Sequence, residues 1–338
     1  MSLLPWQTAQ WQQLSDRHRQ DKLPHAVLLN GPAGLGKHQF AEQFAKSLLC
    51  NDRLADGSAC GQCRGCLLLK AESHPDLIRI EPEEAGKAIK VEQVRGLSDF
   101  TVLSAHVADG YKVVLLDPAE NMNRASANSL LKTLEEPAKN TVLLLVTSNP
   151  QRLLATIRSR CQRIDFISPD HSSAVAWLKS QQINQAEQWL EIAGGAPITA
   201  LELANSVEKE DKDVAEHYQT GLNVLQGLLV RDNDPLSVAT QWQKTGGLRI
   251  VGWLTNWVMD IIRLATVVDS ASKPPYMACP SQFSGLNSLA GQLELEGLHS
   301  YLERLYEASR LLATTQVNQQ LLLEEILIRW TALPKNRL

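Results

Sequence analysis

A short apolar run that leads directly into a glycine-rich loop constrains the fold of this chain more than any other feature. The run is Ala26–Asn30, the next residues (31–38) read GPAGLGKH, and a helical pattern follows. Glycines let a backbone wrap around phosphate oxygens, amides at a helix start donate to those oxygens, and a lysine adds positive charge. The order of strand, loop and helix therefore predicts a phosphate-binding loop built from Gly31, Gly34, Gly36 and Lys37.

The last position of this loop departs from the usual motif. A Ser or Thr hydroxyl normally coordinates Mg²⁺ there, but the chain has His38. Imidazole is a poor substitute for a hard oxygen ligand on Mg²⁺. Binding of ATP with Mg²⁺ is therefore doubtful, although Lys37 and the loop glycines leave simple nucleotide binding open.

Four further apolar runs follow in the first half of the chain. They span residues 77–80, 112–117, 141–147 and 162–166, and helical patterns such as Ser126–Glu136 lie between them. Runs without polar alternation are typical of strands buried on both faces, and parallel strands need helical crossovers. Residues 1–167 are therefore predicted to form an α/β domain with a parallel sheet.

The pattern becomes helical from Pro169 onward, with no convincing strand. Asp170 is a candidate helix cap, and the polar stretch Ser206–Asp213 is interpreted as a linker. The run Leu321–Trp330 is apolar almost all round, which predicts a buried last helix. We expect a small helical domain at 168–207 and a helical domain at 208–338.

Four of the six cysteines crowd into one insert after the loop helix, at residues 50–66. Cys50, Cys60, Cys63 and Cys66 have the spacing C-x9-C-x2-C-x2-C. Four thiolates around one Zn²⁺ form a closed, structural site, and we favour this interpretation. An iron–sulfur cluster and free thiols are the alternatives.

Composition excludes several function classes. The net charge of -4 provides no global basic field for nucleic acid, and no apolar run approaches the length of a membrane span. The first residues lack the basic start and apolar stretch of a signal peptide. We expect a cytoplasmic protein without a membrane partner. A zinc-bearing nucleic-acid-binding module is a weaker alternative, because it requires a basic, aromatic-rich face.

Longer motifs point to a known family. The cysteine insert is followed by Ser-His-Pro-Asp (73–76), by ANSLLKTLEEP (127–137) and by IRSRC (157–161). With the phosphate loop, they resemble bacterial clamp-loader subunits of the AAA+ class over most of residues 24–167. The resemblance implies an AAA+ domain with a five-stranded parallel sheet, a small helical lid domain and a helical collar domain for oligomerisation. The delta-prime type matches best.

Active members of this family carry three features that the chain lacks. His38 stands in place of the Mg²⁺-binding hydroxyl, and Pro118 follows Asp117 where the catalytic glutamate is expected. Pro197 occupies the place of an arginine that reaches the nucleotide. The resemblance therefore implies a degraded nucleotide site, with Asp117 beside the loop, and no ATP hydrolysis by the chain itself. An active ATPase of the gamma/tau type is the alternative.

The resemblance assigns a role to Arg160. It would act as an arginine finger in trans, at the ATP site of a neighbouring gamma/tau subunit. From the residues alone, a surface arginine paired with a carboxylate is the alternative. The family implies a hetero-oligomer with gamma/tau and delta subunits, which loads the sliding clamp onto primer–template DNA during replication.

Overall fold

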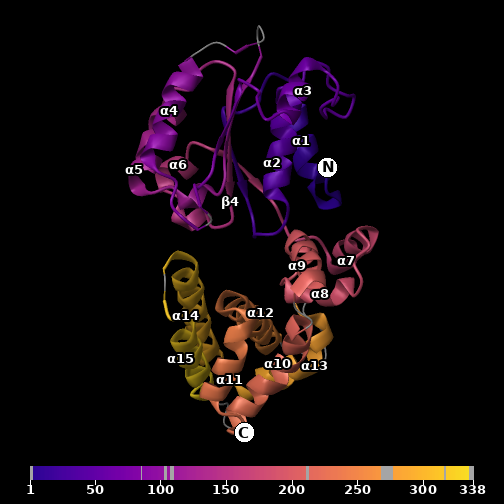
Figure 1. Cartoon of the computed structure of the whole chain (residues 1–338), viewed down its shortest axis with the longest axis vertical. Helices are drawn as coiled ribbons and strands as arrows, with labels where there is room; N and C mark the ends of the chain where they lie inside the picture. Colours follow the sequence, from indigo (N-terminus) through magenta and orange to yellow (C-terminus); the bar gives the residue numbers. More distant parts are fainter. Residues whose placement is uncertain are drawn as a thin grey trace. The chain divides into compact units, whose positions relative to one another are not determined.

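The chain folds into two compact units, Met1–Pro169 and Asp170–Leu338 (Figure 1). The structure is a computed structural model. It describes residues 3–84, 86–102, 105–106, 110–210, 213–267, 277–315 and 317–334.

The first unit is built on one sheet of five parallel strands, in the order β2-β3-β4-β1-β5. The central strands β1, β3 and β4 are buried along their whole length, as their unbroken apolar runs require. The predicted parallel sheet is therefore confirmed. The strands are β1 (Ala26–Asn30), β2 (Leu77–Ile80), β3 (Lys112–Leu116), β4 (Thr141–Thr147) and β5 (Gln162–Asp165).

Helices cover both faces of this sheet (Figure 1). One face packs on an aromatic cluster in which Phe40 contacts Trp11 and Phe166 edge-on, with ring centroids 5.9 and 5.0 Å apart. The other face packs on aliphatic side chains that include Leu97 and Leu130. The helices are α1 (Thr8–Arg19), α2 (Lys37–Leu48), α3 (Arg64–Lys70), α4 (Val91–Val102), α5 (Arg124–Glu135) and α6 (Ala155–Arg158).

Parallel pairing brings the carboxyl ends of the strands to one edge of the sheet. The phosphate loop leaves β1 there, Asp117 follows β3, and Ser148 follows β4. Because β4 pairs with both β1 and β3, these three segments are neighbours. In open α/β sheets this edge is where ligands bind.

The second unit is made of helices joined by turns and loops, and no strand is found among its described residues. The predicted cap is present, because the Asp170 carboxylate accepts a hydrogen bond from Ser173 N. No helix in the described part of the chain combines the length and apolar character needed to cross a bilayer. The helices are α7 (His171–Ser180), α8 (Ala186–Ile192), α9 (Pro197–Glu210), α10 (Asp213–Val230), α11 (Pro235–Trp242), α12 (Gly247–Thr266), α13 (Phe283–Gln292), α14 (Leu295–Thr314) and α15 (Gln319–Thr331).

The predicted linker at Ser206–Asp213 was wrong in its described part. Helix α9 continues to Glu210, and α10 begins at Asp213. The stretch is polar, but its Glu and Lys residues are good helix formers, and it contains no Gly or Pro. Polarity alone therefore did not break the helix.

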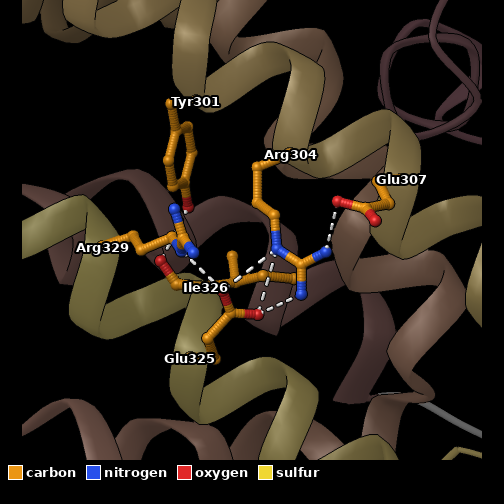
Figure 2. A network of polar contacts seen from close by, with 6 residues as sticks. All are labelled: Tyr301, Arg304, Glu307, Glu325, Ile326 and Arg329. Carbon is orange, nitrogen blue, oxygen red and sulfur yellow. Dashed lines mark hydrogen bonds and ion pairs between the residues drawn. The ribbon is translucent and has the colours of Figure 1, made fainter.

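Helix α15 is only half buried, which corrects the prediction of a fully buried last helix. Trp330 is completely buried, but the side chains of Leu321 and Ile328 are 61% and 47% exposed. An ionic network links α15 to α14 beside this exposed face (Figure 2). Glu325 accepts hydrogen bonds from Arg304 and Arg329, and the Tyr301 hydroxyl donates to Ile326 O.

Candidate functional site

The phosphate loop has the backbone that its glycines predict. Gly34 and Gly36 adopt φ angles of 71° and 79°, in the left-handed region that favours glycine. At Gly31 a Cβ would lie 2.3 Å from Phe166 O, so a side chain there would collide with the end of β5. The loop then passes into α2 at Lys37, and so presents amides of a helix start.

The ammonium group of Lys37 is turned into the protein. Lys37 is only 4% exposed, and its Nζ donates to Pro32 O at 2.6 Å and to Ser148 Oγ at 3.0 Å. Burial lowers the pKa of Lys37 to about 8, although the nearby Glu120 and Asp117 favour the charged form. The lysine that would contact phosphate therefore has neutral oxygen partners from the loop itself and from the end of β4.

His38 and Asp117, predicted from separate motifs, contact each other. His38 Nδ1 lies 2.7 Å from Asp117 Oδ2, and the hydrogen bond to Asp117 raises the pKa of His38. In an active site of this type the carboxylate and a hydroxyl would both face Mg²⁺. Here the imidazole engages the carboxylate instead, so the substitution at residue 38 also occupies Asp117.

Glu120 is engaged as well. Its Oε1 accepts hydrogen bonds from the backbone amides of Ser148 and Asn149, at 2.9 and 3.2 Å. It therefore braces the loop after β4. Glu120 lies two residues after Pro118, and no local sequence pattern predicts its partners 28 and 29 positions further along the chain.

The start of the chain contacts the outer side of the loop. Trp6 Nε1 donates to Leu35 O at 3.0 Å, and Gln7 Nε2 donates to Leu35 O and Gly36 O. The sequence carries no signal for these contacts, because the partners are 28 or more positions apart.

The four predicted metal ligands converge at the other end of α2. The Sγ atoms of Cys50, Cys60, Cys63 and Cys66 all lie within 4.8 Å of one another. Three of the separations are 3.6, 3.7 and 3.9 Å. A tetrahedron with zinc–sulfur bonds of about 2.3 Å has edges of about 3.8 Å. The thiols therefore match a single tetrahedral ion, whereas a polynuclear cluster would hold them further apart.

Backbone amides point at these sulfurs. Cys60 N and Cys63 N lie 3.3 Å from Cys50 Sγ and Cys60 Sγ respectively, and Cys66 N lies 3.5 Å from Cys63 Sγ. Burial opposes ionisation of Cys63, but the amides of Cys66 and Asn51 lower its pKa to about 6. Burial raises the pKa of Cys66 to about 12. A metal ion that binds all four thiolates would therefore displace protons.

Arg160 lies on the turn between α6 and β5 and is part of an ion pair. Its Nη2 lies 2.8 Å from Glu135 Oε1, and its Nη1 donates to Thr156 O at 3.1 Å. Both side chains are exposed, at 37% and 52%. The next residue, Cys161, packs against the sheet core. The pairing matches the alternative of a surface arginine with a carboxylate, and Glu135 was not among the predicted site residues.

Comparison with known proteins places this geometry in a family. Family models described as DNA polymerase III, delta subunit, and its C-terminal part match residues 6–170 and 197–332. DNA polymerase III subunit delta' of Pseudomonas aeruginosa is 38% identical over 337 residues, and the match covers 98% of each chain. The chain belongs to the delta-prime subunits of DNA polymerase III. The delta-prime subunit of Escherichia coli K12 is 29% identical, over 97% of this chain and 95% of that one.

The chain is also similar to a tau/gamma subunit and to a gamma-related structure. The tau/gamma subunit of Haemophilus influenzae is 39% identical over 159 residues, which are 47% of this chain and 22% of that protein. A gamma-subunit-related structure from Thermotoga maritima is 20% identical and covers 96% of this chain and 99% of its own, with a TM-score of 0.42. The five-stranded parallel sheet of the first unit and the helices of the second agree with the predicted α/β and all-α parts of the chain.

Proposed function

We propose that this chain is a clamp-loader subunit that takes part in loading the sliding clamp onto primed DNA and does not itself hydrolyse ATP. The observation that carries the second part is the contact between His38 and Asp117 at 2.7 Å. A carboxylate engaged by imidazole is a weak Mg²⁺ ligand, and Pro118 provides no base for the attacking water. ATP binding and turnover would then belong to the neighbouring gamma/tau-type subunits.

Arg160 is the residue through which we propose that the chain acts on a neighbour. Guanidinium is permanently charged and can hold two phosphate oxygens at once. Exposed ion pairs contribute only about 0–1 kcal/mol, so a phosphate can replace Glu135 as the partner of Arg160 at little cost in free energy. Glu135 would hold Arg160 in an exposed position until a neighbouring ATP site replaces the carboxylate.

The test is reconstitution of the chain with gamma/tau-type and delta-type subunits. In that complex Arg160→Ala should leave assembly intact and lower DNA-stimulated hydrolysis at the affected site by about a thousandfold. Arg158→Ala is the matched control, because Arg158 lies two residues before Arg160, carries the same charge and is also exposed. Unchanged ATP hydrolysis in the complex with the Arg160 variant would refute the proposed arginine finger.

Hydrolysis by the purified chain tests the other half of the proposal. We expect none above background. Turnover that is lost in Lys37→Ala would instead favour an active ATPase of the gamma/tau type.

We further propose that Cys50, Cys60, Cys63 and Cys66 hold one structural Zn²⁺. The support is the sulfur geometry, which fits one tetrahedral ion and leaves no position for a reacting water. The ion would tie the insert into a closed loop beside α2. We also propose a cytoplasmic location, where the thiols of the chain would stay reduced.

Within the second unit we propose a lid at 168–207 and an oligomerisation collar at 208–338. The lid would contain α7, α8 and most of α9, and the longer helices would form the collar. The collar would bind the gamma/tau and delta subunits. Contact with the sliding clamp and with primer–template DNA would come through the complex.

A further inference from the structure

Arg53 is a half-buried cation inside the cysteine insert, and the nucleotide chemistry does not use it. Among the described residues no carboxylate lies within ion-pair distance of its guanidinium. Burial lowers the pKa of Arg53, and the nearby Tyr111 and Cys50 oppose that effect. An arginine that is held in such a place without an acidic partner requires another source of negative charge.

The hydrogen bonds of Arg53 join the insert to the body of the first unit. Its Nε donates to Ser47 O at 2.5 Å, and its Nη2 donates to Leu48 O at 3.0 Å. These carbonyls belong to the last turn of α2, where the helix dipole is negative. Two residues further along the chain stands Cys50, so Arg53 closes the segment that carries this thiol back onto the helix.

Arg53 also contacts α1 through His18. Its Nη1 lies 2.6 Å from His18 Nε2. The same Nη1 lies 2.8 Å from His18 Nδ1, so the guanidinium lies against the imidazole ring. Burial and the neighbouring Arg53 lower the pKa of His18 to about 4, so the imidazole is neutral at pH 7 and does not repel the guanidinium. Arg53, His18, Cys50 and Tyr111 line a cavity of about 600 Å³.

We infer that Arg53 is a positioning residue for the metal site: it holds Cys50 in place and supplies a counter-charge to the thiolates. This inference rests on the proposed zinc site. Four thiolates and one divalent ion leave two negative charges in a partly buried place, and partners of metal ligands commonly offset such charge. The forked guanidinium of Arg53 contacts two helix carbonyls and an imidazole at once. A lysine ammonium is a single compact group and could not reach all three.

The test compares zinc release from the full-length chain to a chelator. Arg53→Met should release zinc about tenfold faster than the wild type, and Arg53→Lys should fall between them because it keeps the charge and loses the fork. Arg64→Met is the matched control: Arg64 lies between two of the ligands, carries the same charge and is exposed. It should release zinc at the wild-type rate.

Visible absorption of the Co²⁺-substituted proteins gives a second measurement, since it reports the geometry of the four thiolates. It should change in the Arg53 variants and stay constant in Arg64→Met. Equal release rates for Arg53→Met and the wild type would overturn the inference, and so would an equally fast Arg64→Met.

Circular dichroism in excess zinc checks that the variants fold. If Arg53→Met fails to fold, Arg53→Lys decides, and a wild-type rate for it would overturn the positioning role. A wild-type chain that retains no metal and shows no Co²⁺–thiolate absorption would refute the zinc site itself, which separates that failure from a failure of Arg53.

Discussion

Helix α2 has two different chemical sites at its two ends. At its start the polar groups of the phosphate loop have found partners inside the protein: Lys37 on Ser148 and Pro32 O, and His38 on Asp117. At its end four thiols face one another, with sulfur–sulfur distances that suit an ion between them. One site is closed by its own side chains, and the other is shaped for a ligand.

The difference shows how the two sites respond to an added ligand. A nucleotide with Mg²⁺ would have to break the contacts of His38 and Lys37 before it gained its own, which lowers its net affinity. A metal ion at the cysteines only replaces protons and weak contacts between thiols. The histidine at position 38 therefore does more than remove a Mg²⁺ ligand, because its imidazole also binds the carboxylate of Asp117.

The largest expected effect is loss of the metal site. Cys63→Ser should abolish stoichiometric zinc binding, since structural zinc sites of small domains are worth about 10 kcal/mol. Hydrogen exchange should then increase across residues 50–70, whereas β1 and β4 keep their protection because the aromatic and aliphatic cores remain. Cys161→Ser, outside the cluster, should retain full zinc. Stoichiometric zinc in the Cys63 variant would contradict the four-thiol site.

A smaller effect is expected when the phosphate end is reopened. His38→Ser removes the imidazole from Asp117 and restores a hydroxyl, so affinity for a nucleotide with Mg²⁺ should rise about tenfold, the value of one charge-assisted hydrogen bond. Fluorescent-nucleotide titration measures this change. Turnover should still be absent because of Pro118.

The same titration without Mg²⁺ is the control, and there the gain should disappear. His38→Ala separates the release of Asp117 from the added hydroxyl. If His38→Ser gains nothing from Mg²⁺, the contact between His38 and Asp117 does not restrict the site.

A further effect, on stability rather than on binding, concerns the charge of Lys37. Burial lowers the pKa of Lys37 to about 8 in the folded chain, from 10.5 for an ordinary lysine such as one in the unfolded chain. Between these values the unfolded state binds more protons, so the cost of burying the charge is complete below pH 8 and fades as the pH rises toward 10.5. Relative to Lys37→Met, the wild type should therefore gain on the order of 2 kcal/mol between pH 7 and pH 10.

Urea unfolding of both proteins at the two pH values measures this gain, and groups that titrate in both proteins cancel. A constant difference between the two would mean that Pro32 O and Ser148 compensate the buried ammonium fully. The hydrogen bonds of Lys37 would then fully offset the burial of its charge. The phosphate loop would differ even more clearly from the cysteine cluster, whose thiols we propose to bind a metal ion.

Local patterns predicted most of the elements. The bounds of β1, β2 and β4 agree with the apolar runs to the residue, and Asp170 caps α7 as expected. Such features depend on neighbours within a few positions, where side-chain periodicity and caps act directly. The two errors, at Ser206–Asp213 and on α15, both came from taking polarity or apolarity of a segment as a direct measure of its burial or order.

Sequence by itself determined the phosphate loop, the four cysteines and the missing glutamate at Pro118, because each depends on residue type at a short spacing. Tertiary structure alone decided what these groups contact. His38 and Asp117 are 79 positions apart, Lys37 and Ser148 are 111 apart, and Arg53 finds His18 across 35. These residues come within hydrogen-bond distance because β4 pairs with β1 and β3 and because α1 packs on α2. Local sequence periodicity depends on near neighbours and cannot predict such contacts.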